Sequence, residues 1–229
     1  VLIAAELMIN NNDGKGLLFG NITGVPPTEV VILGAGTVAE YAVRTALSLG
    51  ANVKVFDNSI ARLRRIQNNL NSRVATSILQ PKVLEKALRR ADVAIGALGT
   101  SAVRTPCVIS DEMVQLMKSK SVIVDVSIDK GGCFETSEIT NHEKPTFVKH
   151  DVIHYCVPNI ASRSSKTASY SLSNVLAPIL LEVGDGGGVQ GMLLRSQNIR
   201  CGVYVYNGVI TNKGIGSWFE LPFKEIRLI

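Results

Sequence analysis

Short apolar runs and amphipathic helical patterns alternate along the central part of this chain. The runs are nearly continuous in apolar residues, which is typical of parallel strands covered by helices on both faces. This alternation predicts a doubly wound α/β fold. Strands are predicted at Glu29–Leu33, Asn52–Phe56, Arg73–Ile78, Val93–Ala97, Ser121–Val126 and Val152–Cys156. Helices are predicted at Thr37–Leu49, Ile60–Leu70, Lys82–Arg90 and Asp111–Met117.

Different patterns flank this central part. The chain opens with VLIAAELMI, a helical run with no N-cap residue before it, so we expect a piece of a longer protein. The following NNNDGKGLLFGNITGVPPTE predicts a loop. Beyond Thr167, SYSLSNVLAPILLEV predicts a long helix, GDGGG a helix breaker and GVYVYNGVITN a strand. We therefore predict an opening helix and linker (1–22), a central domain (23–166) and a C-terminal α/β extension (167–229) that returns to an absent domain.

A glycine-rich turn follows the first predicted strand. Gly34, Gly36 and Ala39 form GxGxxA between a strand and a helix, and Asp57 ends the next strand. In this context the motif predicts a Rossmann-type dinucleotide site, with the pyrophosphate at the start of the helix. Asp57 is expected to accept hydrogen bonds from the adenosine ribose and to repel a 2′-phosphate. The expected cofactor is NAD rather than NADP, although Arg62 could soften the preference.

Bulk composition narrows the function classes. Of the 229 residues, 46% are hydrophobic and 19% charged, which is enough for a globular core. The net charge of +5 comes with no basic stripe among aromatics, so no nucleic-acid partner is expected. No apolar run reaches membrane-span length, and no membrane association is expected. The four cysteines form no CxxC pair, which favours reduced thiols in a cytoplasmic protein.

Polar residues follow several strands at the edge where a doubly wound sheet binds its ligands. The stretches are GALGTSAVRTP, VDVSIDKGGCFET and HYCVPNIASRSSKTASYS. In the second, Asp125 and Asp129 precede Gly131 and Gly132. A carboxylate here could orient or deprotonate a substrate at the nicotinamide end, or Asp129 could simply bond backbone amides in a capped turn. The residues alone leave both interpretations open.

Three stretches carry a resemblance to a known family. VDVSIDKGGCFETS, GVPPTEVVILGAGTVAEYA and HYCVPNIASRSSKTASYSLSN resemble the NAD-binding portion of alanine dehydrogenases, which are related to the NAD-binding subunit of proton-translocating transhydrogenase. The resemblance implies reversible oxidative deamination of L-alanine to pyruvate and ammonia. It also implies an N-terminal substrate domain that this chain lacks, and a homo-oligomer from dimer to hexamer. Ala39 and SRSSKTAS depart from the family pattern.

The resemblance also implies roles for individual residues. Asp129 matches the catalytic aspartate near the nicotinamide and the substrate amine, Asp57 the ribose aspartate, and Arg62 a basic residue beside the adenosine. Asn159 and Ile160 match residues that line the same cleft. The expected cofactor-binding residues are Gly34, Ala35, Gly36, Thr37, Val38, Asp57, Asn58, Arg62, Ala97, Leu98, Ile128, Asp129, Asn159 and Ile160.

Two other functions are alternatives to the alanine dehydrogenase activity. Transhydrogenase subunits resemble D-L-A-A-E-x-G-G-N at the second stretch, whereas Asp129 and Cys133 here favour the dehydrogenase. A non-catalytic NAD-binding or assembly module is also compatible with the chain.

A metal site is not expected, because His142, His150, His154 and Cys156 are irregularly spaced. We interpret His154 as a strand residue satisfied by a neighbour, and Cys133 and Cys156 as core residues. The apolar GVYVYNGVI is expected to be exposed and to favour self-association.

Overall fold

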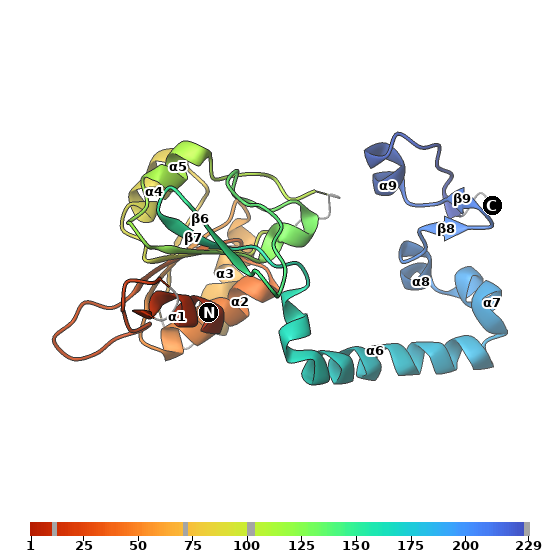
Figure 1. The fold of residues 1–229 in the computed structure, drawn as a ribbon. Coiled ribbons are helices and arrows are strands. Elements are labelled where there is room, and N and C mark those ends of the chain that lie inside the picture. The colour runs from red at the N-terminus through yellow and green to blue at the C-terminus, as the bar shows by residue number, and fades with distance from the viewer. Residues whose placement is uncertain (11–12, 71–72, 100–103, 227–229) are drawn as a thin grey trace. The chain divides into compact units, whose positions relative to one another are not determined.

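A computed structural model describes residues 1–10, 13–70, 73–99 and 104–226 (Figure 1). The chain forms two compact units, Val1–Asn159 and Ile160–Ile229. Within the described part of the first unit, seven strands form one sheet in the order β3-β2-β1-β4-β5-β7-β6. The strands are β1 (Glu29–Leu33), β2 (Asn52–Phe56), β3 (Ala75–Ser77), β4 (Val93–Gly96), β5 (Val122–Asp125), β6 (Thr146–Lys149) and β7 (Val152–Tyr155).

Helices cover both faces of this sheet. Figure 1 shows α4 (Pro81–Leu88) and α5 (Asp111–Gln115) on one face, with α1 (Leu2–Met8), α2 (Thr37–Ser48) and α3 (Ile60–Asn69) on the other. The apolar sheet residues alternate between the faces. Val31 and Leu33 of β1 belong to the core that includes Leu84 and Leu88 of α4. The doubly wound α/β fold predicted from the apolar runs is thereby confirmed.

The order of the strands has one switch point, which lies between β1 and β4. β1 pairs in parallel with β2 on one side and with β4 on the other. Successive strands are therefore added on one side of β1 up to β3, and from β4 onward on its other side. In open α/β sheets this reversal leaves a crevice at the carboxyl ends of the two strands, and ligands bind there. Gly34 follows β1 and Ala97 follows β4, so both lie at this switch point.

Most predicted elements agree with the observed ones to within two residues. The strands at 29–33 and 52–56 have the predicted bounds, and the helix predicted at 60–70 spans Ile60–Asn69. One strand was not predicted: β6, which pairs antiparallel with β7 at the sheet edge. Its four residues TFVK include Val148, which is 61% exposed. A short edge strand that buries little apolar surface has no clear periodicity.

The second unit contains the predicted long helix. α6 spans Ser165–Asp185, and it ends before Gly187, which has a left-handed φ of +85°. The strand-like segment forms a hairpin of β8 (Val205–Tyr206) and β9 (Val209–Ile210), whose turn has positive φ at both central residues. Three short helices were not predicted: α7 (Gly188–Arg195), α8 (Gln197–Cys201) and α9 (Lys213–Trp218). Glycine occurs inside α7 and α9, which weakens the helical pattern.

Apolar side chains are exposed over this second unit. No residue of α6 is buried, and Val205 of the hairpin is 59% exposed, as predicted for that segment. Self-association through this surface stays a prediction. No helix among the described residues combines the length and the apolar character that crossing a membrane requires.

His154 is satisfied by neighbours inside the first unit, as predicted. Its side chain in β7 is fully buried and stacks on Phe147 of β6, with ring centroids 4.8 Å apart. Nδ1 lies 2.9 Å from the Val152 carbonyl oxygen and Nε2 lies 2.8 Å from the Thr136 hydroxyl. Because a carbonyl only accepts, Nδ1 carries the proton and Nε2 accepts from Thr136. Burial lowers the pKa of His154.

This lowered pKa predicts a specific acid sensitivity. The unfolded chain takes up a proton at His154 below the ordinary pKa of 6.5, whereas the folded chain resists it. Stability from this residue is therefore complete above that pH and is lost as the pH falls toward the folded pKa. Relative to His154→Gln, the wild type should lose up to about 1.4 kcal/mol of unfolding free energy per pH unit there. Urea unfolding at several pH values measures this, and parallel curves for the two proteins would contradict it.

Candidate functional site

The glycine turn after β1 is built on one residue that must be glycine. Gly34 has a φ of +106°, and a Cβ on it would lie 2.3 Å from the Ala97 carbonyl oxygen. Its N–H donates to the Phe56 carbonyl over 2.6 Å. The turn therefore brings the ends of β1, β2 and β4 together, since any side chain at Gly34 would push β1 away from β4.

The next glycine leaves the start of α2 open. Gly36 is the N-cap residue of α2, and no side chain among the described residues caps this helix. A Cβ built on Gly36 meets nothing within 4 Å, and Thr37 and Val38 are exposed. The amides of the first turn have no intrahelical acceptor, and the helix dipole adds positive potential there. This arrangement suits an anion such as a pyrophosphate.

Asp57 lies beside this turn at the end of β2. Its carboxylate Oδ2 accepts from the Ala35 N–H over 2.8 Å, and Oδ1 accepts from the Ser59 N–H over 2.7 Å. Arg62 Nη1 lies 3.9 Å from Oδ2 and donates to the Gly99 carbonyl. Each carboxylate oxygen has a further lone pair for a ribose hydroxyl. The side chain of Asp57 is only 7% exposed, so the carboxylate reaches solvent along a narrow approach.

Two residues near Asp57 and the glycine turn have different surroundings. Asn58 is exposed, and its Oδ1 accepts from the Leu79 N–H over 3.2 Å. Arg65 donates to the Ala35 carbonyl over 3.1 Å and so holds the glycine turn from the side of α3. Arg65 is not among the predicted site residues. Its place three residues after Arg62, on the same side of a helix, is the pattern that could have found it.

The second group of predicted residues follows β5. Asp125 ends that strand, and the 3-10 turn η2 (Val126–Lys130) carries Asp129. Asp129 is exposed, and its Oδ1 accepts from the Asn159 N–H over 2.8 Å. A backbone amide therefore does bond this carboxylate, but it lies 30 positions away in the chain, so this bond is not the local turn cap that one of the two interpretations expected. The second oxygen leaves Asp129 able to serve a ligand as well.

The remaining predicted residues are Ala97, Leu98, Ile128 and Ile160. Ala97 and Ile128 are 7% and 3% exposed, so they offer little surface to a ligand. Leu98 is half-buried, and its carbonyl accepts from the Ser127 hydroxyl over 3.3 Å. Residues 100–103 of the stretch GALGTSAVRTP lie outside the described residues. Ile160 begins the second unit, whereas Asn159 ends the first.

Asp125 is a buried carboxylate at the carboxyl end of β5. It is 2% exposed and accepts hydrogen bonds from Ser127, Cys133 and Ser137. Burial raises its pKa, and these hydrogen bonds lower it in part. The sequence offers Asp125 and Asp129 together as candidate carboxylates, and only Asp129 was predicted as a site residue. The hydrogen-bond partners of Asp125 lie up to twelve positions away, beyond any local pattern.

The buried cysteines next to Asp125 are core residues, as predicted. Cys133 and Cys156 are both fully buried. Burial raises the pKa of Cys133 well above its ordinary value and that of Cys156 to about 11. Because the thiolate is the reactive form, neither cysteine has the lowered pKa that a redox role needs. Among the described residues, no three His, Cys, Asp or Glu side chains gather in a way that could hold a metal.

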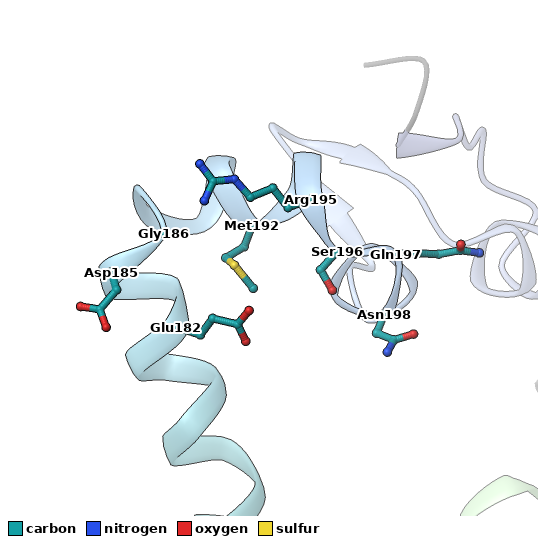
Figure 2. A pocket seen from close by; sticks show the side chains of 8 residues that line it. All are labelled: Glu182, Asp185, Gly186, Met192, Arg195, Ser196, Gln197 and Asn198. Carbon is teal, nitrogen blue, oxygen red and sulfur yellow. The ribbon is translucent and has the colours of Figure 1, made fainter.

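A hollow lies in the second unit. It is lined by the end of α6 and by residues from α7 to the start of α8, and Figure 2 shows Glu182, Asp185, Met192 and Arg195 around it. It contains none of the predicted site residues. Its lining carries both signs of charge, which does not define a ligand class.

The first unit therefore brings most of the predicted residues to one edge of one sheet. The glycine turn follows β1, Asp57 follows β2, Ala97 and Leu98 follow β4, and Asp129 follows β5. An open backbone cradle at Gly36 next to a carboxylate at the neighbouring strand end fits a dinucleotide. These features define a dinucleotide-binding domain of the Rossmann class.

Comparison with known proteins gives the family. The model for the alanine dehydrogenase/PNT C-terminal domain matches residues 1–213, and the chain belongs to this family. The cofactor of the family is NAD. An alanine dehydrogenase of Mycolicibacterium smegmatis is 35% identical over 223 residues, which cover 97% of this chain and 60% of the relative. The chain thus spans about 60% of the length of this curated relative.

Solved structures agree with this assignment. An L-alanine dehydrogenase structure superposes with a TM-score of 0.88 at 33% identity, and the match covers 96% of this chain and 60% of that one. A transhydrogenase from Sinorhizobium meliloti superposes with a TM-score of 0.64 at 22% identity, covering 78% and 52% of the two chains. The second likeness shows the shared fold alone.

The two glycines of the turn predict losses of stability of different size. Gly34→Ala should lower the free energy of unfolding by about 2 kcal/mol or more, because it combines a left-handed φ with a clash against Ala97. Gly36→Ala should cost less than about 1 kcal/mol, because its Cβ enters open space. Chemical denaturation of both variants tests this. Equal losses would contradict the assigned turn geometry.

Proposed function

We propose that this chain is the NAD-binding domain of an enzyme that oxidatively deaminates L-alanine to pyruvate and ammonia, reversibly and by hydride transfer. The observation that carries the proposal is the placement of Gly34–Val38, Asp57 and Asp129 along one sheet edge, in a chain of this family. When bound, NAD supplies the hydride acceptor. The protein supplies position, charge and proton transfer.

At the adenosine end, the chain holds the cofactor through backbone and one carboxylate. The amides of Thr37 and Val38 bind the pyrophosphate, and the absence of a Cβ at Gly36 lets it approach. Asp57 accepts from the ribose hydroxyls, while Ala35 and Ser59 hold its carboxylate in place. Asn58 and Arg62 border the adenosine. A 2′-phosphate would bring negative charge to Asp57, so NAD is preferred over NADP.

At the reacting end, Asp129 is the catalytic residue of the proposal. Its exposed carboxylate, anchored on the Asn159 amide, orients the substrate amine and accepts a proton from it. Ala97 and Leu98 follow β4, and Ile128 lies in η2 next to Asp129. The family resemblance implies Asn159 and Ile160 as further residues that contact the cofactor. The groups that bind the substrate carboxylate and carbonyl belong to a substrate domain implied by the family resemblance. Catalysis by this chain alone is therefore not expected.

Two other functions remain candidates. A subunit of a proton-translocating transhydrogenase shares the fold, and a non-catalytic NAD-binding or assembly module shares the glycine turn. Asp129 favours the dehydrogenase over the transhydrogenase, as the sequence motif indicates. NADH formation that depends on L-alanine in the whole protein supports the proposal. Dependence on a membrane partner would overturn it.

Cofactor preference tests the adenosine end. The chain should bind NADH at least about tenfold more tightly than NADPH, and Asp57→Asn should bring the two affinities close together. Asparagine is the informative substitution because its oxygen still accepts one of the two amides that Asp57 holds. Calorimetry measures both affinities. Equal binding of NADH and NADPH by the wild type would contradict the assigned role of Asp57.

A matched substitution tests the reacting end. In the whole protein, Asp129→Asn should lower kcat for alanine-dependent NADH formation by about 100-fold, since it removes the proton acceptor. The asparagine oxygen can still accept from the Asn159 amide, so NADH affinity should change by less than about threefold. Steady-state kinetics and a binding titration measure the two effects. An unchanged kcat would remove Asp129 from the mechanism.

A further inference from the structure

Asp125 closes the loop that carries Asp129. Its Oδ1 accepts from the Ser127 N–H over 2.9 Å, at the start of the loop. Its Oδ2 accepts from the Cys133 N–H over 2.9 Å and from the Ser137 hydroxyl over 2.8 Å, at the far end. One carboxylate therefore bonds both ends of the segment that follows β5.

The surrounding backbone leaves room for this carboxylate at two glycines. Gly96 of β4 lies opposite Asp125 in the sheet, and a Cβ there would lie 2.6 Å from Oδ1. A Cβ on Gly132 would lie 2.7 Å from Oδ2, and Gly132 has a φ of +77°. A side chain at either position would displace the carboxylate or the loop. Both glycines therefore leave room for the carboxylate, and a Cβ on Gly96 would also lie 2.6 Å from Cys133 Sγ.

The closed loop joins every segment at the reacting end of the proposed site. Ser127 donates its hydroxyl to the Leu98 carbonyl, and Lys130 accepts from the Thr105 N–H over 2.8 Å. Asp129 accepts from the Asn159 N–H. The segments after β4, β5 and β7 are therefore connected through η2. None of these bonds involves the glycine turn or Asp57 at the adenosine end.

We propose that Asp125 is a positioning residue, whose carboxylate fixes η2 so that Asp129 and the Leu98 segment form the surface for the nicotinamide half of the cofactor. This inference rests on the proposed NAD site. An amide cannot replace the carboxylate. Asparagine has one oxygen and one NH2 group, and donors face both ends of the side chain, so at least one donor would face the NH2 group.

The test compares two ligands that share the adenosine end. ADP-ribose contains the adenosine, the pyrophosphate and a ribose but lacks the nicotinamide. Asp125→Asn in the 229-residue chain should weaken NADH binding by about tenfold and ADP-ribose binding by less than about twofold, as measured by calorimetry. The ratio of the two affinities is informative because general destabilisation lowers both together.

Two further variants make the test decisive. Ser137→Ala removes one hydrogen-bond donor to Asp125 and keeps the Asp125 carboxylate. It should shift the ratio of the NADH and ADP-ribose affinities in the same direction by about threefold. This variant tests the role of Asp125 if Asp125→Asn does not fold. Asp92→Asn is the matched control. Asp92 is also a buried aspartate that accepts a backbone N–H, from Glu29, but at the amino end of its strand. Its ratio should equal that of the wild type.

The outcomes separate this inference from the function on which it rests. Equal loss of both ligands, or no change in either, would overturn the role of Asp125 and leave the NAD site intact. Failure of the wild type to bind either ligand would overturn the proposed function, and this inference with it.

Discussion

The close approach of β1 and β4 at Gly34 is the constraint on which the site depends. A Cβ there would lie 2.3 Å from the Ala97 carbonyl oxygen, so only glycine lets the two strand ends meet. The close approach of the two strand ends forms the switch point of the sheet, and α2 begins next to this point. A backbone cradle for an anion follows from packing alone, without a charged side chain at the cradle itself.

Two buried carboxylates then organise the two ends of the site. Asp57 accepts the amides of Ala35 and Ser59, and Asp125 accepts those of Ser127 and Cys133. Asp57 directly follows β2 and Asp125 ends β5, and each holds the loop that follows it. The more exposed groups, Arg62 and Asp129, are placed by these loops. A buried carboxylate is costly unless its acceptors are filled, so these bonds make each loop conformation specific.

Sequence reasoning predicted the parts of this structure that local patterns encode. The strands at β1 and β2, the glycine turn and Asp57 follow from apolar runs and fixed spacing. It missed β6, whose exposed edge position gives no periodicity, and the short helices of the second unit, which contain glycine. The role of Asp125 could not be predicted, because Cys133 and Ser137 meet it only after the loop has folded back.

The most direct test of the account is a crystal structure of the chain with NAD bound. The account predicts the pyrophosphate on the amides of Thr37 and Val38, the adenosine ribose on the Asp57 carboxylate and the nicotinamide beside Asp129. A dinucleotide bound with its ends exchanged, or bound away from the carboxyl ends of β1 and β4, would contradict it.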